Sequence, residues 1–290
     1  MKRIALFLIT NIAILVVISA IFSIFGIGNV LDENGVDLDL GALLIYSAVI
    51  GFVGSFISLA MSKWVAKRQT GAQVINDATD PDSQWLVSRV RAHSETAGIQ
   101  MPEVAIFQAD EPNAFATGMR RDAALVAVST GLLRNMRQNE IDAVLGHEIA
   151  HIANGDMVTL TLIQGVLNTF VIFLSRIVGH FVDRVILKNE RGHGIGYFVA
   201  SIAAQILLGI IASMIVAWFS RYREFRADEG GALYAGPENM IAALEALKGG
   251  TAELPDGMVS MGIGGGRMAS FFASHPPLDA RIDALRARGA

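Results

Sequence analysis

The sequence predicts a mainly α-helical, polytopic membrane protein with a cytoplasmic α+β domain. Hydrophobic residues make up 52% of the 290 residues and charged residues only 17%, a balance that favours a membrane protein over an ordinary soluble one. Apolar segments long enough to cross a hydrocarbon core of roughly 30 Å occur four times, and segments with helix and strand patterns lie between them. The four expected spans are residues 4–26, 41–62, 157–182 and 197–219.

The composition also excludes several classes of partner and site. The net charge is −4, and no run dense in Lys and Arg stands apart from a membrane flank, so no nucleic-acid partner is expected. Because the chain has no cysteine, thiolate metal sites and a cysteine nucleophile are excluded. His, Asp and Glu are left as the candidate metal ligands.

The first two spans form a transmembrane hairpin, residues 1–62, with both ends in the cytoplasm. The apolar stretch of the first span is longer than that of a signal peptide and no clean cleavage site follows it, so we expect a retained anchor. The loop NVLDENGVDLDL has four acidic residues and no Lys or Arg. It therefore lies outside by the positive-inside rule, and residues 63–156 begin a cytoplasmic domain. The flanking basic residues are Lys2, Arg3, Lys63, Lys67 and Arg68.

The second pair of spans forms another membrane hairpin, residues 157–219. Its connecting loop, residues 183–196, carries Arg184, Lys188 and Arg191, which resist export. Either both spans cross fully and these residues snorkel at the far interface, or the pair only dips into the membrane from inside. We favour full crossing, after which residues 220–290 form the second part of the cytoplasmic domain.

A small α+β region precedes the most informative motif. Residues 84–97 have the pattern of an amphipathic helix that stops at Gly98, and the stretches EVAIFQ and AALVAVST, which begin at Glu103 and Ala123, have the pattern of strands. His93 lies on the expected helix, and we interpret it as a surface or capping histidine.

The stretch VLGHEIAHIANGD carries the expected chemistry. Apolar residues recur at helical spacing from Asn139 to Ala153, and Asn154-Gly155 provides a stop signal. On such a helix His147 and His151 project about 40° apart, one turn above the other, so both imidazoles can reach one ion. This pattern suits a zinc ion, with the adjacent Glu148 able to deprotonate a water molecule.

A third zinc ligand must come from a distant acidic residue, because no further histidine lies within a few residues of Gly155. The best candidate is Glu224 in SRYREFRADEG, since Asp228 lies one helical turn later and is able to accept a hydrogen bond from a ligating histidine. The alternative for Glu224 is a solvated charge among juxtamembrane arginines. Weaker candidates for the third ligand are Glu229, Glu238 and Glu245.

The chain resembles the HtpX-type membrane zinc metalloproteases, relatives of the CAAX prenyl proteases, over nearly its whole length. The motifs that carry the resemblance are MKRI at the start, NAFATG at 113–118, GHEIAHIANGD at 146–156, REFRAD at 223–228 and SHPPLDARI at 274–282. The resemblance implies a zincin-like metalloprotease domain with one zinc ion. It implies that His147, His151 and Glu224 are the zinc ligands, that Glu148 is the catalytic base, and that Asp228 forms a hydrogen bond with a ligand without binding the metal itself.

The resemblance also implies a location and a role. The protein is expected in the bacterial inner membrane with its site facing the cytoplasm, where it degrades damaged or misfolded membrane proteins under stress. Other membrane quality-control proteases are candidate partners. The competing hypotheses are a prenyl-protein-processing protease, a non-catalytic zinc-binding membrane protein and a transporter. The transporter is disfavoured because the motif lies between spans rather than within them.

Two further segments of the resemblance suit roles that the zinc motif leaves open. Asn113, Ala114 and Phe115 follow a turn and are able to present a strand edge to an extended peptide, with Asn113 bonding the substrate backbone; a plain hairpin is the alternative. His275 is a candidate hydrogen-bond donor to the oxyanion that forms when a peptide carbonyl is attacked. The alternative is that it is simply a residue near the start of a helix. The Gly- and Met-rich segment 258–272 is either a mobile flap over the site or a disordered loop.

Overall fold

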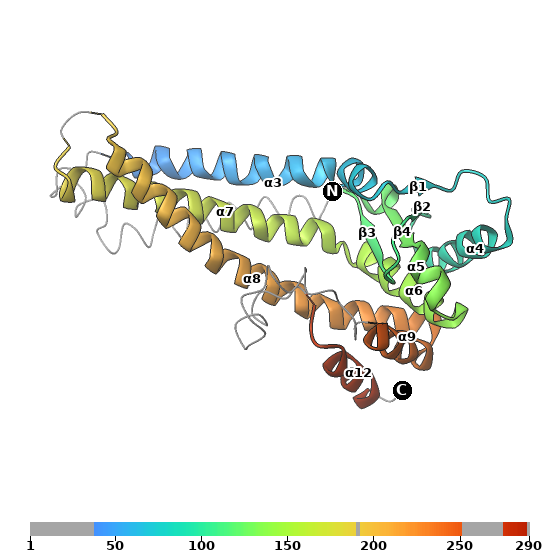
Figure 1. Ribbon diagram of the computed structural model, residues 1–290. Helices are drawn as coiled ribbons and strands as arrows, with labels where there is room; N and C mark the ends of the chain where they lie inside the picture. The colour runs from blue at the N-terminus through green and yellow to red at the C-terminus, as the bar shows by residue number, and fades with distance from the viewer. Residues whose placement is uncertain (1–37, 190–191, 251–274, 289–290) are drawn as a thin grey trace. The chain divides into compact units, whose positions relative to one another are not determined.

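The computed structural model describes residues 38–189, 192–250 and 275–288 (Figure 1). The expected span 4–26 and the segment 258–272 lie outside these residues. The chain divides into two compact units. One consists of Met1–Ile57 and Thr161–Ile215, and the other of Ser58–Leu160 and Val216–Ala290.

Within the described residues, three helices are long and apolar enough to cross a membrane. They are α3 (Leu40–Thr70), α7 (Asp156–Phe181), which continues as a π-helical turn over Val182–Ile186, and α8 (Ile195–Ala235). These helices contain the second, third and fourth spans expected from the sequence. Large apolar side chains such as Ile50 and Ile202 are exposed along them, as expected of surfaces that face lipid.

In the unit that contains most of the apolar helices, glycines let α3 and α7 approach closely (Figure 1). A Cβ atom at Gly51 would lie only 2.7 Å from the backbone nitrogen of Thr169, and one at Gly165 would lie 2.7 Å from the ring of Phe52. Small residues at such contacts are typical of helix pairs in membranes, where close van der Waals packing replaces the hydrophobic effect.

The connection between α7 and α8 is organised by one buried carboxylate. Asp183 accepts hydrogen bonds from the backbone nitrogen of Gly194 and the side-chain amide of Asn189, both at 2.9 Å, and so supplies a cap for the start of α8. The rings of His180 and His193 pack against Tyr197, with centroid distances of 4.8 and 4.2 Å. His180 and His193 thus lie in one ring cluster with Tyr197.

The second unit contains a four-stranded sheet with the order β1-β2-β4-β3. Strands β2 and β4 are parallel, and the two outer pairings are antiparallel. The expected strands near Glu103 and Ala123 are confirmed, and the 113–118 segment also supplies a strand, β3, at a sheet edge. The strand bounds are β1 Gln73–Val74, β2 Glu103–Phe107, β3 Ala114–Thr117 and β4 Leu125–Ser129, with a short 3-10 turn over Arg121–Ala123.

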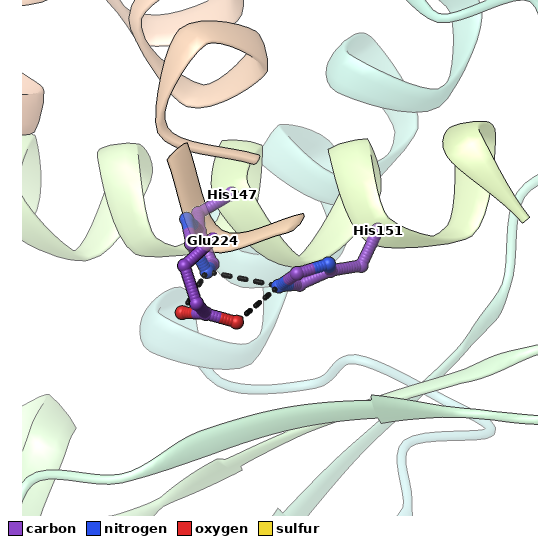
Figure 2. A group of neighbouring side chains, drawn as sticks. All are labelled: His147, His151 and Glu224. Atoms are coloured by element: carbon purple, nitrogen blue, oxygen red, sulfur yellow. Dashed lines mark hydrogen bonds and ion pairs between the residues drawn. The ribbon is translucent and has the colours of Figure 1, made fainter. Parts of the chain in front are cut away.

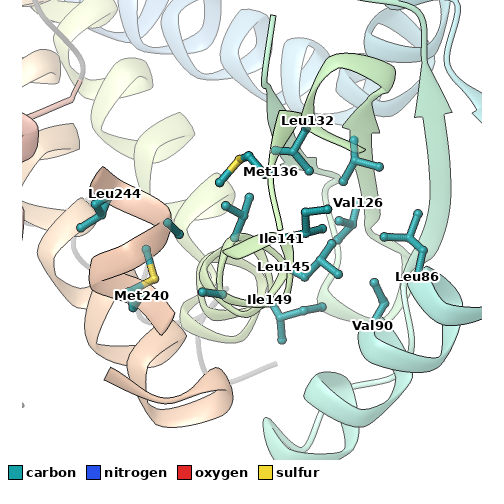
Figure 3. Packing of buried hydrophobic residues seen from close by; sticks show 14 of the residues in the cluster. Leu86, Val90, Val126, Leu132, Met136, Ile141, Leu145, Ile149, Met240 and Leu244 are labelled. Carbon is teal, nitrogen blue, oxygen red and sulfur yellow. The ribbon is translucent and has the colours of Figure 1, made fainter. Parts of the chain in front are cut away.

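Helix α6 (Gln138–Asn154), which carries the HExxH motif, lies at the centre of the main core (Figure 3). Leu145 and Ile149 on α6 pack with residues of the sheet and of the neighbouring helices, including Leu86 and Val90. Each fully buried side chain of this kind contributes roughly 1.5–3 kcal/mol, so the core fixes the position of α6. The other helices of this unit are α4 (Pro81–Thr96), α5 (Thr130–Asn135), α9 (Pro237–Gly250) and α12 (Leu278–Ala287).

The structure corrects the interpretation of His93 as a surface or capping histidine. Its side chain is only 2% exposed, and its Nε2 lies 2.7 Å from Oδ1 of Asp142 on α6. Arg89, one turn earlier on α4, forms two hydrogen bonds of 2.7 Å with the same carboxylate. His93 therefore helps to attach α4 to the helix that carries the metal-binding motif.

Candidate metal centre

The ends of α6 are set by local contacts that hold its two histidines in place. At the start, the Glu140 side chain accepts a hydrogen bond of 2.7 Å from the backbone nitrogen of Arg137, as in a capping box. At the end, Gly155 adopts a left-handed conformation with φ 69°, which glycine adopts without strain. The predicted helix and its stop at Asn154-Gly155 are thus confirmed, and His147 and His151 lie one turn apart.

Glycines bring α8 close enough to α6 to complete a site. A Cβ atom at Gly231 on α8 would lie 3.2 Å from the backbone nitrogen of His147, and a Cβ atom at Gly230 would overlap the side chain of Ala150. Gly146 on α6 faces Gly231. Because none of these positions carries a side chain, the backbones pack closely, and the buried face of α8 reaches the histidines.

Three candidate ligands converge from these two helices (Figure 2). The Nε2 atoms of His147 and His151 are 3.1 Å apart. The carboxylate of Glu224 lies 3.3 Å from Nε2 of His151 and 3.6 Å from Nε2 of His147. Zinc bonds of about 2.0–2.2 Å in a tetrahedron place ligand atoms about 3.3 Å apart. The observed spacings, which involve Oε1 of Glu224 for His151 and Oε2 for His147, are close to this value and suit a zinc ion.

Each histidine is held from behind by a carboxylate. Oδ1 of Asp228 lies 3.0 Å from Nδ1 of His147, and Oδ2 of Asp156, the first residue of α7, lies 2.6 Å from Nδ1 of His151. A carboxylate at Nδ1 holds the proton there and turns the Nε2 lone pair toward the ligand position. The sequence suggested Asp228 for this position, but we did not anticipate Asp156.

Arg281 on α12 is a second residue that we did not anticipate. It donates hydrogen bonds of 2.5 and 2.8 Å to the two oxygens of Asp228, and its Nη1 lies 3.4 Å from Oε2 of Glu224. A bidentate arginine of this kind fixes the orientation of a carboxylate more firmly than a lysine does. The position was visible in the sequence only as part of the SHPPLDARI motif.

The buried charges around the three ligands do not balance. Among the residues that the structure describes, four carboxylates are buried here together with two guanidinium groups, which leaves two negative charges if both histidines are neutral. Buried charge is costly unless it is compensated, so the site suits a divalent cation. The carboxylates belong to Glu148, Asp156, Glu224 and Asp228, and the guanidinium groups to Arg223 and Arg281.

This excess of negative charge shifts the pKa values of both histidines. Burial lowers the pKa of His151, but its hydrogen bonds with Asp156 and Glu224 and the nearby charge of Glu148 raise that pKa to about 9. Burial also lowers the pKa of His147, whereas its hydrogen bonds with Asp228 and Glu224 raise it above the usual value for histidine. Both rings consequently take up protons readily when no other cation compensates the carboxylates.

The structure places the remaining predicted residues at different distances from the ligands. Nδ1 of His275 lies 2.8 Å from Oε2 of Glu224, and the His275 side chain is 64% exposed. Asn113 pairs through its backbone with Ser129, and its side chain is exposed. Along β3, Ala114 contacts the core cluster around α6, whereas Phe115 packs on Phe107 in the cluster on the other face of the sheet.

Comparisons with known proteins agree with one another. The model of peptidase family M48 matches residues 80–289. The chain is 60% identical to the protease HtpX of Hydrogenovibrio crunogenus, covering 99% of this chain and 97% of the relative. It is 61% identical to the protease HtpX of Alkalilimnicola ehrlichii, covering 99% and 98%.

The fold is also similar to a solved structure. The crystal structure of S. mikatae Ste24p superposes with a TM-score of 0.62 at 17% sequence identity, covering 97% of this chain and 67% of that protein. At this level of identity, the likeness concerns the fold.

Proposed function

The chain belongs to peptidase family M48 as a membrane metallopeptidase of the HtpX type, and from this premise we propose that it is a zinc endopeptidase that degrades damaged or misfolded membrane proteins. The observation that carries the proposal is the convergence of two histidines from α6 and one glutamate from α8 at spacings that fit a tetrahedral ion. Three protein ligands leave a fourth position for water or substrate, which is the arrangement of catalytic rather than structural zinc.

We assign the metal to His147, His151 and Glu224. A bound zinc ion supplies Lewis acidity, which polarises a peptide carbonyl and lowers the pKa of water to about 7. The carboxylates of Asp156 and Asp228 hold the protons on the far sides of the two rings, so that both Nε2 atoms present lone pairs to the metal. Arg281 holds Asp228 in turn.

Glu148 is the proposed general base. It is buried and follows His147 directly on α6, next to the place where the attacking water must lie. Its carboxylate takes the proton of the water as the carbon of the peptide carbonyl is attacked, and then delivers that proton to the departing amine. Because water is the nucleophile, no covalent enzyme intermediate forms.

Substrate contacts are assigned to β3 and to His275. As an edge strand, β3 has backbone groups able to pair with an extended peptide, and residues Asn113–Phe115 begin this edge. Glu224 holds His275 through Nδ1, and the ring is otherwise exposed; we assign its other ring nitrogen as a candidate donor to the developing oxyanion.

The placement of basic residues supports our proposal for the cellular setting. Lys63, Lys67 and Arg68 at the end of α3 favour a cytoplasmic location for the site. We place the protein in the bacterial inner membrane, where it acts in stress-linked quality control beside other membrane proteases. Its substrates are membrane proteins that have lost their native packing.

The proposal is tested with the full chain purified in detergent and loaded with zinc. Glu148→Gln should retain stoichiometric zinc and lose cleavage of an unfolded membrane protein, whereas His147→Ala should lose both zinc and cleavage. Glu229→Gln is the matched control, because Glu229 is an acid on α8 that pairs with Arg288 away from the ligands. Persistent turnover by Glu148→Gln would refute the role of the base.

Two competing functions give different results in the same preparation. A prenyl-protein-processing enzyme would cut a short prenylated peptide and spare unfolded membrane protein. A non-catalytic zinc protein would bind the metal and cut neither substrate, with or without a chelator.

A further inference from the structure

The exposed face of α8 changes in character from turn to turn beside the metal centre. Residues on this face follow one another at intervals of three or four, so they form one stripe along the helix. The stripe begins with Ile211 and Ile215, continues with Trp218 and Tyr222, which are 62% and 60% exposed, and reaches Arg226. Apolar, then aromatic, then cationic side chains are the order found where a helix leaves a bilayer.

The candidate metal ligand Glu224 lies on the opposite face of α8, at about the same position along the helix axis as the aromatic residues. Glu224 is buried two residues after Tyr222, and Asp228 is buried one turn further on. At a rise of 1.5 Å per residue, Glu224 lies about 3 Å beyond Tyr222 and about 9 Å beyond Trp218 along the helix axis. The ligand is therefore level with the aromatic and cationic part of the stripe, not with the solvent far from the membrane.

The end of α3 gives an independent second marker in the same unit. Trp64 is 61% exposed, and the neighbouring Lys63 and Lys67 both pair with Glu103, at 2.7 and 2.6 Å. Aromatic and basic residues together mark a membrane interface. Glu103 is the first residue of β2, so this end of the sheet is attached to the interfacial turn of α3.

The pairing of the strands shows which end of the edge strand β3 lies beside Glu103. Glu103 is opposite Leu125 on β4, and Leu125 is opposite Thr117 on β3. Thr117 thus lies at the membrane end of the strand that we assign to substrate pairing. Both the metal ligand on α8 and the edge strand thus lie at the level of the lipid headgroups.

We propose that the site works within the headgroup layer of the bilayer and takes peptide segments that directly flank a membrane span. This inference rests on the proposed proteolytic function for the substrate, and on α8 and α3 alone for the position of the site. A segment that leaves the membrane reaches the level of Glu224 after about three extended residues, since a strand rises about 3.3 Å per residue. A distant soluble segment must instead return to the membrane surface.

The position is tested by spin-labelling the full chain in lipid vesicles. The sequence has no cysteine, so single variants Ile215→Cys, Trp218→Cys, Tyr222→Cys and Arg226→Cys can each be labelled alone. Their relative accessibility to oxygen and to a water-soluble nickel complex should shift from lipid-like to water-like between Trp218 and Arg226. Ile206→Cys in the apolar part of α8 is the lipid control, and Ser88→Cys on the exposed face of α4 is the aqueous control.

The substrate class is tested with one cleavable segment placed at different distances from a membrane span. Directly after the span, the segment should be cut on the order of tenfold faster than after a spacer of about 30 flexible residues, because the local concentration at the membrane surface falls with spacer length. A soluble protein that contains the same segment should be cut more slowly than either membrane-anchored form.

The outcomes separate this inference from the proposed function. Equal rates for all spacers, or a label at Trp218 as accessible to nickel as the Ser88 control, would overturn the inference while proteolysis stands. If neither the anchored nor the soluble segment is cut, the proteolytic function and its substrate class fail. The accessibility profile still decides where the metal ligands lie.

Discussion

Zinc binding to this site should release protons, and the number released can be worked out from the buried charges. In the part of the chain that the structure describes, four buried carboxylates face two guanidinium groups around the ligands, so two positive charges are missing when the histidines are neutral. The pKa of His151 is raised to about 9, and that of His147 is raised as well. In protein stripped of metal, His151 is therefore expected to be largely protonated at pH 7, and the raised pKa of His147 favours its protonated form as well. A zinc ion must displace these protons because it binds neutral imidazole.

The magnitude follows from this count. Between one and two protons should be released per zinc ion at pH 7, and the number should fall as the pH rises toward 9, where His151 loses its proton unaided. Each released proton changes the apparent affinity about tenfold per pH unit, so zinc should bind about 10–100 times more tightly at pH 7 than at pH 6. The sign is set by the raised pKa values: acid weakens metal binding.

Calorimetry in detergent measures the release directly. Zinc is titrated into metal-free protein in several buffers of the same pH and different ionisation enthalpies, and the slope of the observed heat against that enthalpy gives the number of protons. Glu148→Gln is the matched variant, because it keeps all three ligands and removes one neighbouring charge. Release below about 0.3 protons at pH 7 would show that the buried charges are compensated in another way, and would refute this account of the site.

Four further predictions concern the residues that support the ligands and their helix. Asp156→Asn should weaken zinc binding about 10–100-fold with little loss of folded protein; an unchanged dissociation constant would remove Asp156 from the site. Arg281→Lys should reduce kcat/KM more than zinc content, because lysine cannot form the bidentate contact, and kinetics together with metal analysis separate the two effects. Gly231→Val should prevent assembly of the site, seen as loss of zinc from a chain that still enters the membrane, since any side chain there meets the backbone of α6. Desolvation raises the pKa of Asp142, but hydrogen bonds with His93 and Arg89 lower that pKa below its usual value. The ionised Asp142 therefore stabilises the fold above about pH 4, and this stabilisation is lost as the pH falls further. Thermal melts against pH should show that loss in the wild type and not in Asp142→Asn.

Much of the fold could be predicted because its signals are local. The HExxH helix, its stop at Gly155 and the two main strands depend on periodicity within a few residues. The described apolar helices depend only on length and composition. Glu224 could also be predicted, because a third ligand was required and Asp228 lies one helical turn after it.

What could not be predicted depends on contacts between distant residues. His93 was misjudged because its partner Asp142 lies 49 residues away, and no local pattern signals that a polar residue on α4 is buried against α6. Arg281 meets Asp228 across 53 residues. Its role depends on how α12 packs, which the last motif of the chain does not reveal.

Asp156 shows a different reason for a missed residue, because it is only five positions from His151. On a continuous helix, a side chain five residues later projects about 140° away, so the acid looks unable to reach the ring. Gly155 breaks the helix in the left-handed conformation, and the chain restarts as α7 with Asp156 turned back toward His151. The first residue of an apolar, membrane-length helix thus holds a candidate metal ligand. Glu224 likewise lies beyond the apolar part of α8, so one candidate ligand and the carboxylate that holds another are carried by helices long enough to cross a membrane. This gives a physical reason for building this protease on membrane spans.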